Sequence, residues 1–277
     1  MTLIPEIQRA DCLEWLAQIP SGVVDLAFAD PPFNQGFEYE EYEDTRDPLD
    51  YTEWCQRWIA ELHRVLKPNG TCWLASGDAF VSWLDIAATV GGDLSMLGSR
   101  KAKPGFNRRS WVVWYYTFGV NCVKNFTKSH THLLYYTKHK SNFTFNSDDP
   151  AVRHASARQL VYKDKRADPT GRLPDNTWFI LEQQIAELLR DMDDVWLQPR
   201  VNGTFKERMK GQSCQMPKAV MERIIRLTSN PGDLVIDPFL GSGVTCQVAQ
   251  ELGRRSMGCD IGGESVKRAK QLCGVTD

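Results

Sequence analysis

The chain has 277 residues, of which 42% are hydrophobic and 25% are charged. This composition excludes a disordered chain and suffices for one sizeable core plus an inserted subdomain. Lys and Arg (33) nearly balance Asp and Glu (35), so nucleic acid can be bound only through local basic patches. No stretch approaches the roughly 20 apolar residues of a membrane helix, and residues 1–7 lack a secretory pattern. We therefore expect no membrane partner and a cytoplasmic location.

The eight cysteines are scattered, without a C-x-x-C pair or a regular spacing. Most have apolar neighbours, which indicates reduced core side chains rather than a disulfide framework or a zinc site. His130 and His132 form an H-x-H pattern, but no third ligand stands at a supporting distance in the sequence, and the alternation suits a strand. We expect no metal.

The first predicted elements are a helix that begins at Asp11 and a buried strand over residues 23–29. Asp is a favoured N-cap, and Glu14 follows three residues later. The segment VVDLAFA contains a short apolar run with β-branched and aromatic side chains, Val23, Val24, Leu26 and Phe28. The two prolines at 31 and 32 lock φ and remove two backbone donors, so the strand ends at Asp30. In an open α/β sheet, this edge is where ligands bind.

The corner after this strand consists of Asp30, Pro31, Pro32 and Phe33. Asp30 offers carboxylate oxygens, the Pro31 carbonyl is an acceptor, and Phe33 offers a flat ring. These groups suit a planar amino group such as the exocyclic amine of a nucleobase. Acceptors on its hydrogens favour the cationic nitrogen that forms as it attacks an electrophile. The alternative interpretation is a turn that only ends the strand.

The middle of the chain begins with an acidic, aromatic segment after the corner, which predicts a loop beside the site. Apolar periodicity and turn residues then predict helices over 51–67 and 79–89 and strands over 71–74, 111–117 and 133–137, the last two paired as a hairpin at the sheet edge.

The segment 100–109, RKAKPGFNRR, has five cations and no acidic residue, and Pro104 and Gly105 interrupt any regular structure. One interpretation is a solvated loop. The other is a contact with a DNA backbone beside the base site.

From about residue 145 to 212, charge comes in basic, acidic and again basic blocks, which indicates an inserted region. A helix predicted over 178–192 can pack on the core or on another subunit.

A second constellation lies near the C-terminus. A helix over 218–228 precedes a strand over 234–236, then DPFLGSG opens a helix over 244–252, and a further strand ends at Asp260. This is a Rossmann-like βαβ half, in which Gly241 and Gly243 permit a tight turn.

The glycine turn of this half lacks the spacing of a dinucleotide-binding motif, which limits the ligands that it can bind. Its spacing is not G-x-G-x-x-G, which disfavours a nicotinamide oxidoreductase. Asp260 can take two ribose hydroxyls, and Asp237 can attract an amino group. An adenosine ligand that carries a sulfonium instead of phosphates fits best, which predicts S-adenosylmethionine as cofactor.

DPPF together with DPFLGSG resembles the amino-methyltransferases of DNA, and the order of the two motifs resembles their circularly permuted β class. The resemblance extends over nearly the whole chain, through RADCLEWL, EWCQRWIAELHRVLKPNG, HLLYYTKHKSNFTFN and DVWLQPRVNGTFKERMKGQSCQMP. It implies a circularly permuted, Rossmann-like α/β sheet of a methyltransferase with an inserted target-recognition region. The implied parts are a catalytic half at 1–145, a target-recognition region at 146–212 and a cofactor-binding half at 213–277 of the same domain.

The resemblance also implies roles for single residues. Asp30, Pro31, Pro32 and Phe33 form the catalytic corner that holds the target base. Asp11 contacts the adenine of the cofactor and Asp260 its ribose. The full cofactor-binding set is Asp11, Asp237, Phe239, Gly241, Ser242, Gly243 and Asp260. The candidate DNA-binding set is Arg100, Lys101, Lys103, Arg108, Arg109, Arg200, Lys206 and Arg208.

The sequence departs from the family pattern at three places. Ala10 stands where Gly usually precedes Asp11, Phe33 replaces the commoner Tyr, and GQSCQMP at 211–217 lacks the usual His and Lys.

The implied reaction is methyl transfer to the N6 amino group of adenine within a specific sequence of double-stranded DNA, because members whose motif begins with Asp usually act there. Alternatives are cytosine N4, the same chemistry on RNA, and a binding-only protein, which the intact Asp30 disfavours. A homodimer and a cognate restriction endonuclease stay open as partners.

Overall fold

The computed structural model describes residues 3–90, 105–120, 122–124, 126–154, 159, 162–178 and 215–275. No helix within these ranges has the length and apolar character needed to cross a membrane. Seven of the cysteines lie in the described ranges, none is in a disulfide, and six of them are buried, as expected for small core residues.

A single mixed sheet runs through the described part of the chain in the order β1-β8-β7-β2-β3-β5-β4-β6. The strands from β1 to β3 in this order are parallel, and β5 and β4 form an antiparallel hairpin beside β3. The bounds are β1 Glu6–Arg9, β2 Val24–Ala29, β3 Leu66–Ser76, β4 Asn107–Val120, β5 Lys128–Thr137, β6 Thr177–Trp178, β7 Leu234–Asp237 and β8 Arg255–Asp260. The expected Rossmann-like α/β sheet is confirmed.

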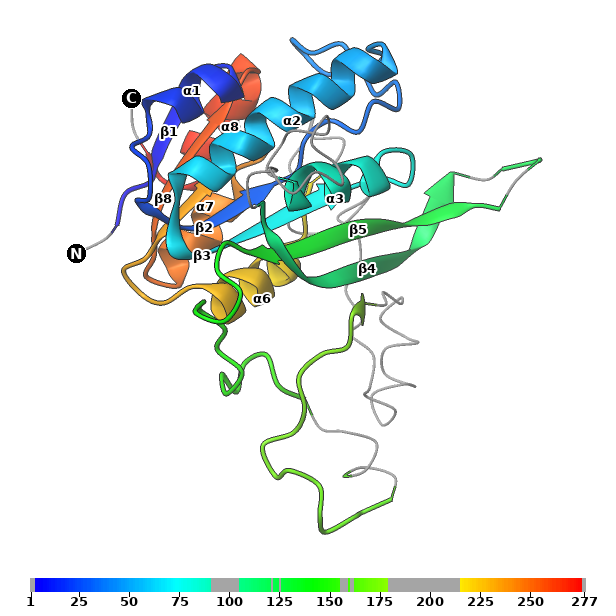
Figure 1. Ribbon diagram of the computed structural model, residues 1–277, viewed down its shortest axis with the longest axis vertical. Helices are drawn as coiled ribbons and strands as arrows, with labels where there is room; N and C mark the ends of the chain where they lie inside the picture. The colour runs from blue at the N-terminus through cyan, green and yellow to red at the C-terminus, as the bar shows by residue number, and fades with distance from the viewer. Residues whose placement is uncertain are drawn as a thin grey trace.

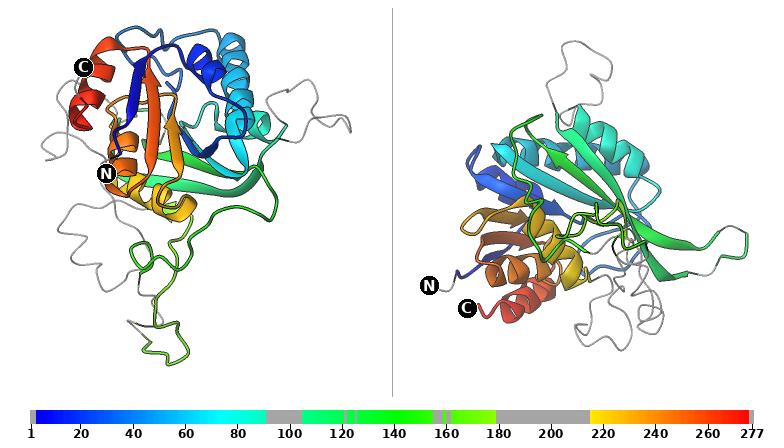
Figure 2. Two further views of the ribbon diagram at one scale, coloured as in Figure 1. Left: turned by 90° about the vertical axis from the view of Figure 1, so that its left-hand side faces the viewer. Right: turned by 90° about the horizontal axis from the view of Figure 1, so that it is seen from below.

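Helices cover both faces of the sheet (Figures 1 and 2). The alternation along β2 separates two cores: Ala27 and Ala29 pack with α1, α2 and α3, whereas Leu26 and Phe28 pack with α6 and α7. A smaller cluster joins α8 to β1 and α7. The bounds are α1 Cys12–Gln18, α2 Pro48–Val65, α3 Val81–Thr89, α6 Lys218–Thr228, α7 Val244–Glu251 and α8 Gly263–Leu272.

The junction of α2 and β3 differs from the expectation. The helix ends at Val65 and the strand begins directly at Leu66, five residues before the predicted start. Pro68 disfavours helical backbone at the residue before it, so the chain is already extended at Lys67. Residues 67–70 form an irregularity, because the β2–β3 register shifts between the pairs Val24–Leu66 and Leu26–Thr71.

Two further predicted elements have different outcomes. The hairpin is confirmed and is longer than predicted. The helix predicted from Trp178 is wrong at its first residue, which lies in β6 beside Trp114 of β4. Residues 179–192 lie outside the described ranges.

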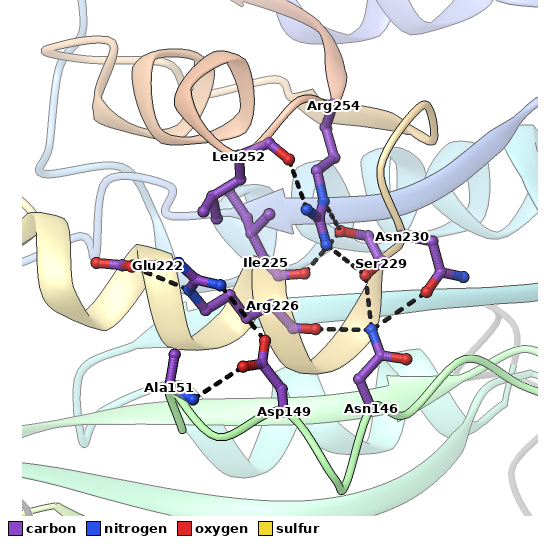
Figure 3. Close-up of polar contacts among 10 residues, drawn as sticks. All are labelled: Asn146, Asp149, Ala151, Glu222, Ile225, Arg226, Ser229, Asn230, Leu252 and Arg254. Atoms are coloured by element: carbon purple, nitrogen blue, oxygen red, sulfur yellow. Dashed lines mark hydrogen bonds and ion pairs between the residues drawn. The ribbon is translucent and has the colours of Figure 1, made fainter. Parts of the chain in front are cut away.

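The C-terminus of α6 joins segments far apart in the chain (Figure 3). The Asn146 amide donates to the carbonyls of Arg226 and Ser229, at 2.8 Å each. The buried Arg254 guanidinium donates to the same Ser229 carbonyl at 2.7 Å. Carbonyls at a helix end lack intrahelical partners, and these two side chains supply them. The chain that leaves the catalytic half is therefore fastened to the C-terminal half.

Candidate active site

Two corners of the sheet open into one cavity. β2 and β7 are parallel neighbours, paired at Leu26–Val235 and Ala27–Ile236, so the residues that follow them emerge at the same edge. Asp30 follows the first strand, and Asp237 ends the second. A cavity of about 360 Å³ is lined by both aspartates and by Gly241. The two motifs therefore face one space, as the sequence required.

The first corner is held by a buried tyrosine from α2. The Tyr51 hydroxyl donates to the Pro32 carbonyl at 2.7 Å, and its ring lies 4.6 Å from that of Phe80. This bond occupies the Pro32 carbonyl and fixes the corner against the helix. Tyr51 was expected only as part of a helix, and nothing in its local pattern indicated a partner 19 residues away.

The loop that follows the corner is organised by Asp44. Its carboxylate accepts backbone N–H bonds from Asn34 at 2.7 Å and from Gln35 and Phe37 at 3.0 Å. Asn34 has a left-handed backbone, φ 55°, and its side chain accepts from the Arg46 N–H at 2.8 Å. Asn tolerates this conformation better than most residues do. The acidic segment thus forms a defined loop beside the site.

Phe33 lines the cavity next to Gly77 of the turn after β3. A Cβ at Gly77 would lie 3.3 Å from the Phe33 ring and 2.3 Å from the Gln35 amide nitrogen. A larger residue would therefore displace Gln35 and press on the ring.

Asp237 is fully enclosed at the start of the second corner. One oxygen accepts from the Phe239 N–H at 2.9 Å, and the other accepts from the Thr245 hydroxyl at 2.6 Å. Burial raises the pKa of Asp237 to about 7, against the effect of these two bonds. Its carboxylate holds the turn through these two bonds. The predicted attraction of an amino group of the ligand to Asp237 stays a prediction.

The glycine turn continues this corner. The Gly241 N–H donates to one oxygen of Asp260 and the Gly262 N–H to the other, each at 2.8 Å. Gly243 has φ 86°, and a Cβ there would meet the Ala269 Cβ at 2.7 Å. Only glycine therefore permits this turn to pack on α8. Each Asp260 oxygen keeps a second lone pair that can accept from a ligand hydroxyl.

The other predicted cofactor residues surround the same space. Asp11 caps α1, accepting from the Leu13 N–H at 2.8 Å. The Phe239 ring makes edge contacts with two tryptophans of α2, Trp54 at 5.6 Å and Trp58 at 5.3 Å. The predicted cofactor residues that line the cavity are Asp11, Asp237, Phe239, Gly241, Ser242 and Asp260. Of the atypical segment 211–217, Gln215 and Met216 also line it, and residues 211–214 lie outside the described ranges.

The acidic loop forms one wall of the cavity and reaches across to the second corner. Glu41 pairs with Arg9 at 2.6 Å. Glu40 accepts from the Glu264 N–H at the start of α8 at 3.1 Å and lies 3.5 Å from Arg268. The loop after the catalytic corner is thus tied to the end of β1 and to α8.

The predicted cluster of uncompensated cations beside the site is wrong for Arg108 and Arg109. They lie at the start of β4, where Asn107 pairs with Thr137, which itself pairs with Thr71, so they stand at the sheet edge opposite the cavity. Arg108 pairs with Asp85 at 2.5 Å. A role of either residue in DNA binding stays a prediction. The remaining candidates lie outside the described ranges: Arg100, Lys101, Lys103, Arg200, Lys206 and Arg208.

His130 and His132 have a third neighbour in space, contrary to the expectation from the sequence. Their Nε2 atoms lie 2.9 and 3.0 Å from one oxygen of Asp78. The Trp111 indole donates to Nδ1 of His132 at 2.9 Å. Indole is a donor only, so the proton of the neutral His132 ring stands on Nε2 and faces Asp78.

A metal-binding imidazole has the opposite arrangement, with its far nitrogen donating. Burial lowers the pKa of His132, which favours the neutral ring. The geometry is therefore that of a hydrogen-bonded clamp between the turn after β3 and the start of β5.

The charges around the cavity suit a cationic adenosine ligand. The lining carboxylates are Asp11, Asp30, Glu38, Glu40, Glu41, Asp237 and Asp260, and the lining cations are Arg46, Lys128 and Arg268. Carboxylates outnumber cations, which opposes a pyrophosphate and favours a sulfonium. The residues present thus fit S-adenosylmethionine.

Comparison with known proteins agrees with this geometry. A family model described as DNA methylase, covering methyltransferases that act at N6 and N4, matches residues 24–271. The type II methyltransferase M.HpaI of Haemophilus parainfluenzae is 32% identical over 95% of this chain and 73% of its own length. The DNA adenine methyltransferase YhdJ of Escherichia coli K12 is 31% identical over 94% of this chain and 80% of its own.

Two solved structures share the fold. A complex of M1.HpyAVI with S-adenosylmethionine aligns with a TM-score of 0.62 at 19% identity, over 98% of this chain and all of that chain. The cytosine-N4-specific PvuII DNA methyltransferase aligns with a TM-score of 0.64 at 17% identity, over all of this chain and 88% of that chain. The chain therefore belongs to the DNA methylase family of N6- and N4-directed methyltransferases, which use S-adenosylmethionine.

Proposed function

We propose that this protein transfers a methyl group from S-adenosylmethionine to the N6 amino group of adenine in a specific sequence of double-stranded DNA. The observation that carries the proposal is the shared cavity, in which Asp30 and Phe33 stand on one side and Asp237 and Asp260 on the other. The adenine methyltransferase among the relatives, and the Asp that begins the catalytic motif, support adenine over cytosine.

The catalytic corner positions the amino group. In this proposal, an Asp30 oxygen and the Pro31 carbonyl accept the two amino hydrogens, and the ring of Phe33 stacks on the base. Because Tyr51 holds the Pro32 carbonyl, the corner is rigid before the base arrives. Acceptors fixed in this way stabilise the positive charge that develops on the nitrogen without a prior deprotonation.

The opposite corner holds the cofactor. Asp260 binds the ribose hydroxyls, Asp11 contacts the adenine ring, and Phe239 with Gly241 and Ser242 surrounds the body of the ligand. Gly243, which does not line the cavity, allows the turn that presents them to pack on α8. When bound, the cofactor supplies an electrophilic methyl group on a sulfonium. The carboxylates of the acidic loop favour this cation and keep phosphate out.

The target base must leave the duplex, because N6 is paired and shielded inside the helix. We assign sequence recognition to residues 146–212, between the catalytic half at 1–145 and the cofactor-binding half at 213–277. A homodimer, a cognate restriction endonuclease and a cytoplasmic location stay predictions.

The product decides the proposal. The chain should be expressed in a host free of DNA methylation. One sample of the host DNA is digested to nucleosides to identify the modified base, and a second, intact sample is sequenced to locate it. We expect N6-methyladenine within one sequence word, and none in cells that express Asp30→Ala. N4-methylcytosine would show that the target is the cytosine amino group, and modification confined to RNA would show that the substrate is RNA. Unmodified nucleic acid would refute the proposal.

A further inference from the structure

The hairpin of β4 and β5 continues past the end of β3 (Figure 1). The last pair between β3 and β5 joins Ser76 to His132, whereas β5 begins at Lys128. Residues 128–131 thus extend beyond β3 by about 13 Å at the usual rise of a strand. This reach exceeds the depth of about 8.5 Å of the major groove of B-DNA.

The loop that joins the two strands carries apolar side chains in solvent. Val123 is 95% exposed and Phe126 is 92% exposed. Cys122 at one end of the loop and Lys128 at the other line the cavity. The exposed apolar tip therefore stands beside the opening through which a target base must enter, and such exposure marks an interaction site.

The charge of the tip identifies the partner. Lys124 and Lys128 flank Phe126, and residues 122–128 contain no acidic residue. The Lys128 ammonium lies 4.0 Å from Asp78, and its side chain is more than half exposed. Cations around an apolar point suit a polyanion with an apolar interior, which describes a base stack between phosphate backbones.

We propose that this hairpin tip inserts into duplex DNA beside the target base, with Phe126 as the wedge that fills the gap in the stack. The inference rests on the proposed function, since only a base that leaves the duplex creates the gap. An aromatic ring can stack on the neighbouring bases and so stabilise the open step. Lys124 and Lys128 hold the adjoining phosphates.

The test compares two short synthetic duplexes that carry the modified word mapped in host DNA. In one the target adenine is paired, and in the other it faces an abasic site. Phe126→Ala should lower the methylation rate of the paired duplex by about 10- to 100-fold, the range of one lost base–aromatic stack. The loss should shrink on the abasic duplex, where the target already lacks its partner, and Phe126→Trp should retain activity.

Ile4→Ala is the matched control, because Ile4 is also apolar, is 70% exposed and precedes β1, far along the chain from the hairpin. It should leave both rates unchanged. Wild-type rates in Phe126→Ala, or an equal loss on both duplexes, would overturn the wedge and leave the proposed function standing. A change of sedimentation coefficient in Phe126→Ala would overturn it in favour of a contact between copies of the chain. Host DNA that carries no modified word would overturn the proposed function, and the wedge with it, before either duplex is made.

Discussion

Asp30 directly follows β2 and Asp237 is the last residue of the neighbouring parallel strand β7. Each is followed by a proline, yet their carboxylates have different surroundings. Asp237 is 2% exposed and accepts from the N–H of Phe239, two residues later. Asp30 is partly exposed and lines the cavity. The residue two positions after Asp30 is Pro32, which has no N–H. The local bond that occupies Asp237 is therefore impossible at Asp30.

The difference explains why the first motif has two prolines. An Asp at a turn normally bonds to the backbone two residues later. In the second corner this bond shapes the glycine turn. In the first corner, Pro32 offers no N–H, so this turn bond cannot form at Asp30. One proline is enough to end a strand, and the second also removes the donor of the turn bond.

Substitution of Asp30 by Asn should produce the largest effect on activity. The amide keeps the shape but removes the charge that stabilises the developing cation, so we expect kcat to fall by about 10²- to 10³-fold. Cofactor affinity and the unfolding temperature should stay close to wild type. Steady-state kinetics, calorimetric titration with S-adenosylhomocysteine and thermal unfolding measure the three quantities. A loss of cofactor affinity as large as the loss of kcat would contradict the division between the corners.

Asp237→Asn should act on stability instead, in a pH-dependent way. Burial raises the pKa of Asp237 from 3.8 to about 7, so the folded protein binds a proton that the unfolded chain releases between about pH 4 and pH 7. Stability from this group therefore falls as pH rises through that window. This change in the pKa of Asp237 corresponds to a free energy of roughly 4 kcal/mol as an upper limit.

The measurement is thermal unfolding without cofactor at pH 5 and pH 8. The Tm of Asp237→Asn relative to the wild-type Tm should be several degrees higher at pH 8 than at pH 5, at roughly 2–4 °C per kcal/mol. Parallel pH profiles of the two proteins would show that the buried carboxylate does not carry this cost.

Pro32→Ala tests the role of the second proline directly. The new N–H at position 32 can donate to Asp30 as Phe239 does to Asp237, and so competes with the substrate. A hydrogen bond to a charged group is worth about 1.5–3 kcal/mol, and partial competition should lower kcat by about tenfold. Cofactor affinity should not change.

Pro238→Ala controls for the loss of a proline ring, because Pro238 follows Asp237 as Pro31 follows Asp30, and the Phe239 donor is already present in the second corner. Its effect on kcat should be smaller. Equal losses in the two variants would mean that ring rigidity, and not the missing donor, is what matters at position 32.

The sequence was sufficient for features encoded within a few residues. The buried strand before Asp30 and the Asp11 cap are confirmed, because a short apolar run ended by prolines and a helix cap are both local patterns. Contacts across the chain were not predictable. Tyr51 reaches Pro32, and Asp78 joins His132 from 54 residues away, through packing alone. The sequence placed Arg108 near the site, but the strand register puts it at the sheet edge opposite the cavity.

The smallest effect should come from the loop that links the corners. Glu41→Gln removes the ion pair with Arg9. The side chain of Arg9 is 59% exposed and that of Glu41 is 41% exposed, so the ion pair contributes little. We expect the cofactor Kd to rise about two- to threefold at low salt. The gap from wild type should close near 1 M salt, where the screening length is about 3 Å.

Glu43→Gln controls for the change of charge, since Glu43 lies in the same loop but accepts from Thr45 instead. If the loop strengthens cofactor binding by fastening itself to the second corner, only Glu41→Gln should show a salt-dependent gap. If it acts through general negative charge near a sulfonium, both variants should weaken binding equally. Equal weakening would mean that the contact of the loop with Arg9 does not strengthen cofactor binding. Asp30 and Asp260 would then line one cavity without being coupled through the loop.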